Sequence, residues 1–185
     1  MTIDYTPFSE IYDIFLSKIT DDLYMELTYE ETLLLLEELL RTSIHKFEFP
    51  RVNLNEIEEI TITEDDEGNP LPTPEVFWAF VNKLSEEEKN ILASYMIVEW
   101  LGQQIASIEV TRMKYSSNDF KMTSQANHLA KLLQAKKEYE KEGFHLQRLY
   151  SRRLKSDSGL YQSTFSSIMA NGVDWSTELE ANYGI

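Results

Sequence analysis

The sequence predicts a mainly α fold: a helical bundle with a long C-terminal helical hairpin and one inserted β-hairpin. Two amphipathic segments, Ser85 to Ser116 and Thr123 to Lys155, carry apolar residues at helical spacing and are joined by a short polar bridge. Two shorter runs, residues 58–63 and 76–81, are rich in aromatic and β-branched residues and flank the turn-forming run 64–70. The shorter runs predict a β-hairpin at about residues 57–82.

The N-terminal part predicts two further helices. Thr6 and Pro7 fit the N-cap and the first helical position of one helix. A capping box of Thr28 and Glu31 opens the next, a leucine-rich helix that we expect to be buried on more than one side. This helix should end before residues 47–50, because a residue that precedes proline disfavours the helical conformation.

The two long segments have recognisable starts. Ser85 and Glu88 form a second capping box, and Thr123 fits the N-cap of the last helix. The first segment is apolar enough to predict a buried central helix. The second is expected to turn its apolar positions toward the core: Leu129, Leu132, Leu133, Tyr139, Leu146, Tyr150 and Leu154.

A basic stripe runs along the last predicted helix. Its residues step by three or four positions, so they share one face: Lys137, Lys141, His145, Arg148 and Arg152. Two interpretations remain open, a solvated face or a partner-binding surface.

Aromatic residues suggest two further contact regions. A β-hairpin alone is marginally stable, so Phe77, Trp78 and Phe80 need cover from a helix or from a neighbouring subunit, and we expect them to bind a neighbouring subunit. Residues 1–155 are predicted to form one helical domain, and residues 156–185 a C-terminal arm. The arm contains aromatic residues that fit docking on a partner, among them Tyr161, Phe165 and Trp175.

The composition of the chain argues against several kinds of site and partner. The chain has 185 residues and no Cys, which excludes disulfides and thiolate metal sites. Residues 1–104 hold 6 Lys or Arg against 23 Asp or Glu, and residues 105–185 hold 11 against 9. Such acidity argues against general nucleic-acid binding. No signal peptide is visible, and the most apolar stretch, Ile91–Ile108, contains Glu99, Gln103 and Gln104, so no membrane contact is expected.

Catalytic and metal motifs are absent from the sequence. The acidic run 64–67 lacks the alternating ligands of a calcium loop, and His45, His128 and His145 have no zinc spacing. We therefore expect no catalytic residues, no metal and no cofactor, and predict that the protein is not an enzyme.

Three stretches carry a resemblance to a known family. They are Glu109–Leu133 (EVTRMKYSSNDFKMTSQANHLAKLL), His145–Arg153 (HLQRLYSRR), and the opening Tyr5–Asp13 with Ile19–Asp22. Together they resemble neck proteins of tailed phages of Gram-positive bacteria, over roughly residues 5–170.

The resemblance implies a structural virion protein. Such head-to-tail adaptors form a homo-oligomeric ring, of roughly twelve copies, beneath the portal protein and extend the DNA channel. The implied partners are other copies, the portal protein and other neck or tail proteins, and genome DNA passes without specific binding. The implied location is the virion neck, with the host cytoplasm during assembly.

Two alternatives remain. One is another neck level, as a stopper or tail-completion protein. The other is a non-viral, soluble helical regulator whose basic stripe binds a partner.

Overall fold

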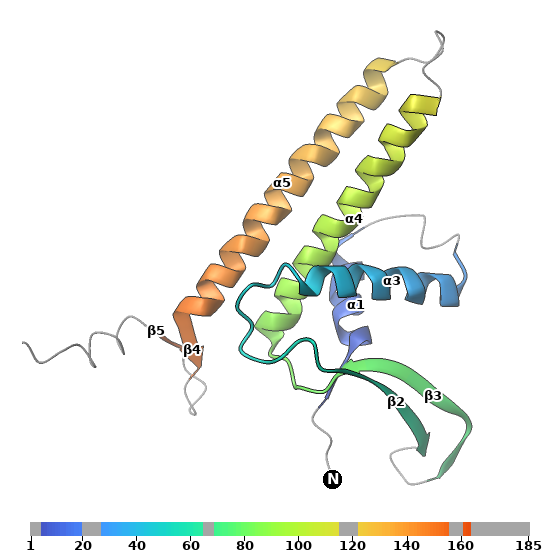
Figure 1. The fold of residues 1–185 in the computed structure, drawn as a ribbon, viewed down its shortest axis with the longest axis vertical. Helices are drawn as coiled ribbons and strands as arrows, with labels where there is room; N and C mark the ends of the chain where they lie inside the picture. Colours follow the sequence, from blue (N-terminus) through green and yellow to red (C-terminus); the bar gives the residue numbers. More distant parts are fainter. Residues whose placement is uncertain (1–4, 20–26, 65–68, 115–121, 156–160, 164–185) are drawn as a thin grey trace, which may run out of the picture. The chain divides into compact units, whose positions relative to one another are not determined.

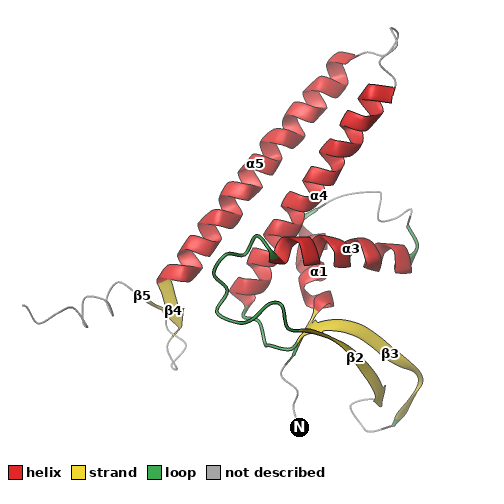
Figure 2. Ribbon diagram, in the orientation of Figure 1, coloured by secondary structure: helices red, strands yellow, loops and turns green. Residues whose placement is uncertain are grey.

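Helices dominate the computed structural model, which describes residues 5–19, 27–64, 69–114, 122–155 and 161–163. The described part contains four helices, α1 (Phe8–Lys18), α3 (Tyr29–Ile44), α4 (Glu86–Lys114) and α5 (Met122–Arg152) (Figure 1). Its strands are β1 (Thr6–Pro7), β2 (Ile57–Glu64), β3 (Pro70–Phe80), β4 (Arg153–Lys155) and β5 (Tyr161–Ser163) (Figure 2). The described residues are 63% helical and include a small three-stranded antiparallel sheet, which confirms the mainly α class with some β.

The chain divides into two units, residues 1–147 and 148–185. In the second unit, β4 and β5 pair antiparallel, with Arg153 opposite Ser163 and Lys155 opposite Tyr161. The predicted extension of the last helix to Lys155 is therefore wrong, because α5 ends at Arg152 and the chain continues as a strand. Of the predicted arm residues, Tyr161 lies in β5, while Phe165 and Trp175 lie outside the described residues.

The start of α1 differs from the prediction. α1 begins at Phe8 with Pro7 at its N-cap position, and Thr6 lies in β1 opposite Phe80. The Thr6 hydroxyl accepts a hydrogen bond from the backbone N–H of Leu84, at 2.8 Å. A side chain expected to cap its own helix therefore stabilises the segment between β3 and α4.

Both predicted capping boxes are confirmed. The Glu31 carboxylate accepts from the Thr28 backbone N–H at 2.9 Å, and the Thr28 hydroxyl accepts from the Glu31 N–H at 3.3 Å. Ser85 and Glu88 make the same reciprocal pair at 2.7 and 3.4 Å. These bonds satisfy backbone donors that the first turn of each helix leaves unpaired.

The core of the first unit surrounds α4. Every residue from Ile91 to Val98 is buried, and α1 and α3 both pack on α4 (Figure 1). The prediction of a buried central helix is confirmed for residues 91–98, whereas farther along α4 Gln103, Ala106 and Ser107 are exposed. α3 buries one face only: Leu36, Leu39 and Leu40 are at most 2% exposed, but Leu34 is 67% exposed. The expected burial of α3 on more than one side is therefore wrong.

The predicted β-hairpin is confirmed as β2 and β3. The three-stranded sheet has the order β1-β3-β2 and is antiparallel throughout. β3 begins at Pro70, six residues before the predicted start at Val76, and the register shifts between Ile62 and Glu64. The hairpin is thus longer and less regular than its sequence pattern indicates.

Besides its earlier end, α5 departs from the prediction at its start and at one core position. It begins at Met122, so Thr123 lies inside the helix and not at the N-cap. Leu133, expected in the core, is 49% exposed. The link between α4 and α5 lies outside the described residues, and the long C-terminal hairpin stays a prediction. No helix in the described ranges is both long and apolar enough to cross a membrane.

Candidate interaction surfaces

One face of the β-hairpin packs against the helices of its own chain. Phe80 is fully buried, and its ring centroid lies 4.8 Å from that of Phe8 in α1. The Arg41 guanidinium of α3 lies 4.8 Å from the Trp78 ring centroid, and Glu37 holds this guanidinium at 2.7 Å. Phe80 is therefore not available to a neighbouring subunit, contrary to the expectation, because α1 covers it.

The opposite face of the hairpin is only partly covered. Phe77 stands opposite Ile60 in the register, and its ring centroid lies 5.9 Å from that of Tyr5. Phe77, Ile60 and Ile62 are all half-buried, as is Trp78 on the first face. Of the three aromatic residues predicted to bind a partner, Phe77 and Trp78 keep exposed area.

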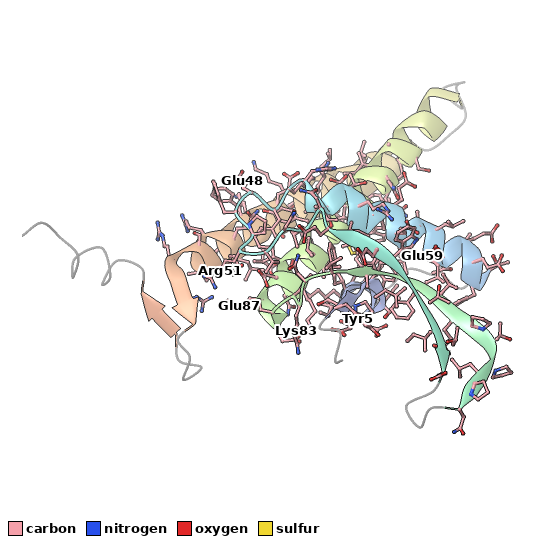
Figure 3. All side chains as sticks on the ribbon, turned by 60° about the horizontal axis from the view of Figure 1, so that its bottom comes forward. Tyr5, Glu48, Arg51, Glu59, Lys83 and Glu87 are labelled. Atoms are coloured by element: carbon pink, nitrogen blue, oxygen red, sulfur yellow. The ribbon has the colours of Figure 1, made fainter. Side chains whose placement is uncertain are left out.

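The hairpin surface is acidic. From residue 52 to residue 82 the sequence contains no Lys or Arg. Among the described residues, Glu58, Glu59 and Glu64 of β2 and Glu75 of β3 are exposed (Glu59 is labelled in Figure 3). Basic or neutral partners therefore suit this surface better than nucleic acid or acidic proteins.

α5 is attached to the rest of the first unit through the buried amide of Gln147. Its Nε2 donates to the Lys46 carbonyl oxygen at 2.8 Å and contacts the Tyr95 hydroxyl, and its Oε1 accepts from the Glu48 N–H at 2.9 Å. Burial raises the Tyr95 pKa, an effect that the bond to Gln147 partly offsets. One side chain therefore joins α5 to both α4 and the loop after α3.

Gly143 allows the close approach of α5 to Tyr95. A Cβ added at Gly143 would lie 3.1 Å from the Cε1 and Cζ atoms of the Tyr95 ring. This is tighter than an ordinary carbon–carbon contact of about 3.5–4.0 Å. The backbone of α5 therefore lies directly against the ring.

The predicted basic stripe is exposed. Lys137, Lys141 and His145 are exposed on α5 within the first unit. Arg148 and Arg152 are exposed in the second unit. The stripe thus offers positive charge on a helix, and its role in binding stays a prediction.

Buried charges in the first unit are compensated. Lys89 is 8% exposed, and its ammonium contacts Glu10 at 2.8 Å and also Glu86. Lys18 is exposed, but partial desolvation lowers its pKa, and its ammonium lies 3.4 Å from the Ser94 hydroxyl. These contacts join α1 to α4 and suit a structural role.

An open hollow of about 430 Å³ lies along α3. It is lined by Leu34, Glu37, Glu38, Arg41, Thr42 and His45. Its Thr42 hydroxyl donates to the Glu38 carbonyl oxygen at 2.7 Å. Within the described residues, no three His, Asp or Glu side chains are grouped so that they could hold a metal ion.

The structure also reveals residues that sequence reasoning missed. Arg41 covers Trp78, and Gln147 connects three segments, yet neither belongs to a motif. Their partners are far away in the sequence, so no local signal identifies them.

Comparisons with known proteins give no assignment: no family model, no curated protein and no solved structure matches this chain.

Proposed function

We propose that this protein is a head-to-tail connector subunit of a tailed-phage neck, which forms a ring with other copies, joins the portal to the tail and extends the DNA channel. The resemblance of residues 109–133 and 145–153 to phage neck proteins supports the neck location. The proposed self-assembly is supported by the separation of exposed charge, because the same chain has an acidic β-hairpin and a basic stripe. Surfaces of opposite charge on identical copies favour head-to-tail pairing, which closes into a ring where the rotation permits.

The proposal includes a long hairpin of α4 and α5. Two close approaches within the first unit support it, Tyr95 to Gly143 and Gly102 to Lys136. Seven residues forward along α4, from 95 to 102, correspond to seven residues backward along α5, from 143 to 136. This is the relation expected of two antiparallel helices. In the proposed ring, the hairpin places the basic stripe at the surface of each subunit.

The proposed role is structural and requires no cofactor. A formal net charge of −15 suits a channel protein, because phosphates passing an acidic wall are not retained. The partners proposed are other copies, the portal protein and adjoining neck or tail proteins. The location proposed is the virion neck, reached from the host cytoplasm during assembly.

The proposal is tested by reversing part of the stripe. Lys137→Glu with Lys141→Glu should abolish ring formation or portal docking and leave the helices folded, because exposed charges contribute little to stability. The control is Lys83→Glu with Lys131→Glu, which gives the same change in net charge at other exposed positions. Native mass measurement gives the oligomer, and circular dichroism gives the fold.

Imaging of purified virions then locates the subunit. A ring directly beneath the portal supports the connector, whereas a ring lower in the neck supports a stopper or tail-completion protein. Equal assembly of the stripe variant and the control would show that the stripe is a solvated face. Absence of the protein from virions would favour a soluble helical regulator.

A further inference from the structure

The outer edge of β2 pairs with no other strand among the described residues. β2 has eight residues and lies at the end of the sheet order β1-β3-β2. Such an edge exposes backbone donors and acceptors that can pair with a further strand.

The backbone groups that face outward follow from the alternation of an antiparallel ladder. The Val81 N–H donates to the Glu56 carbonyl oxygen at 3.0 Å, so these two residues form a hydrogen-bonded pair. Hydrogen-bonded and non-hydrogen-bonded pairs alternate along the ladder, so Glu58 with Ala79 and Ile60 with Phe77 are hydrogen-bonded pairs as well. The intervening residues of β2, Ile57, Glu59 and Thr61, therefore direct their N–H and C=O groups outward.

The outer edge of β3 is less suited to accept a strand. β1 covers this edge only opposite Ala79 and Phe80. Farther along, β3 contains Pro70, Pro72 and Pro74, which have no N–H to donate. Proline on an edge strand is a common means of preventing further pairing. The hairpin thus has one blocked edge and one open edge.

Charge indicates what the open edge would accept. The exposed Glu58, Glu59 and Glu64 make the edge acidic, so a basic strand suits it. This chain contains one: residues 148–155 hold three Arg and one Lys without an acidic residue, and they include strand β4. β5 pairs with one edge of β4, and no described strand pairs with the other.

We propose that the outer edge of β2 binds the basic β4 strand of a second copy of this chain. The inference rests on the proposed ring and names the contact that closes it. β4 has only three residues, so few backbone hydrogen bonds form, and the charges of residues 148–155 supply the rest of the attraction. The contact is head-to-tail, because it joins different surfaces of two copies.

A pair of proline variants tests the edge. Thr61→Pro removes an outward N–H from β2, while Val76→Pro changes the residue directly opposite on the blocked edge of β3. Both positions are exposed, and neither substitution removes a bond between β2 and β3. Thr61→Pro should raise the protein concentration needed for half-assembly about tenfold, and Val76→Pro should leave it unchanged. Native mass measurement over a dilution series gives both values.

A charge exchange provides the second measurement, which remains informative where Thr61→Pro disturbs the hairpin. Glu58→Lys with Glu59→Lys, and separately Arg148→Glu with Arg152→Glu and Arg153→Glu, should each remain monomeric, because the first change makes the edge basic and the second makes residues 148–155 acidic. Mixing the two variants should restore oligomers in which they alternate, because each then meets opposite charge. Equal assembly of the two proline variants, or a mixture that stays monomeric, overturns the edge contact and leaves the ring proposal standing. A wild-type protein that remains monomeric at all concentrations overturns both.

Discussion

Two glycines inside long helices should respond in opposite directions to the same substitution. In a helix interior, alanine is favoured over glycine by about 0.8–1.0 kcal/mol. At Gly102 of α4, an added Cβ would meet the Nζ atom of Lys136 at 3.3 Å, and this end of a flexible side chain can move away. Gly102→Ala should therefore raise the free energy of unfolding by about 0.5–1 kcal/mol.

At Gly143 of α5, the same Cβ would meet the Tyr95 ring at 3.1 Å. Tyr95 is only 5% exposed and its hydroxyl contacts Gln147, so the ring cannot move freely. Overpacking of this kind costs about 1–3 kcal/mol, which exceeds the gain in helix propensity. Gly143→Ala should lower the free energy of unfolding by about 1 kcal/mol.

Urea unfolding followed by circular dichroism at 222 nm measures both effects, provided that the slope with denaturant stays constant. The control is Gly143→Ala in a Tyr95→Leu background, where the smaller side chain relieves the clash and alanine should no longer be harmful. If Gly143→Ala stabilises the wild-type chain as much as Gly102→Ala does, the close approach of α5 to Tyr95 is refuted.

Three further predictions concern single contacts. Gln147→Ala should cost about 2 kcal/mol of unfolding free energy, because it leaves the buried Tyr95 hydroxyl and two part-buried backbone groups, of Lys46 and Glu48, without this partner. Tyr95→Phe removes only one of the three bonds, so a smaller cost for Gln147→Ala than for Tyr95→Phe would argue against the connection. Hydrogen bonds from Thr28 stabilise the charged Glu31 carboxylate and lower its pKa below the ordinary 4.5. The stability that Glu31 contributes is therefore fully present above pH 4.5 and is lost as pH falls through the lowered pKa. Glu31→Ala should thus lose stability relative to wild type at neutral pH, by a difference that shrinks in acid, as measured by thermal melts across pH 2–7. Trp78→Ala should weaken self-assembly by about 2 kcal/mol, as measured by light scattering. Unchanged assembly together with a loss of helicity would instead show that Trp78 serves only the core of its own chain.

Features set by local interactions could be predicted from the sequence. The two capping boxes form between residues three positions apart, and both are present as expected. The apolar pattern of the segment after Ser85 correctly predicted the buried central helix α4. Turn-forming residues between two apolar runs correctly predicted the hairpin of β2 and β3.

Features set by distant contacts could not be predicted. Thr6 was expected to cap α1, but its hydroxyl pairs with Leu84, 78 positions away. Phe80 was expected to bind a neighbouring subunit, but α1 of the same chain covers it. Leu133 follows the helical apolar pattern and is nevertheless half exposed.

The sequence by itself therefore determined the two helix starts with capping boxes, at Thr28 and Ser85, together with the central helix, the hairpin and the uneven charge. The tertiary structure decided which aromatic residues remain exposed, which residue attaches α5, and which edge of the hairpin is open. The physical reason is how far apart in the sequence the interacting residues lie. Capping and periodicity depend on neighbours within a few positions, whereas burial and pairing depend on elements that only folding brings together.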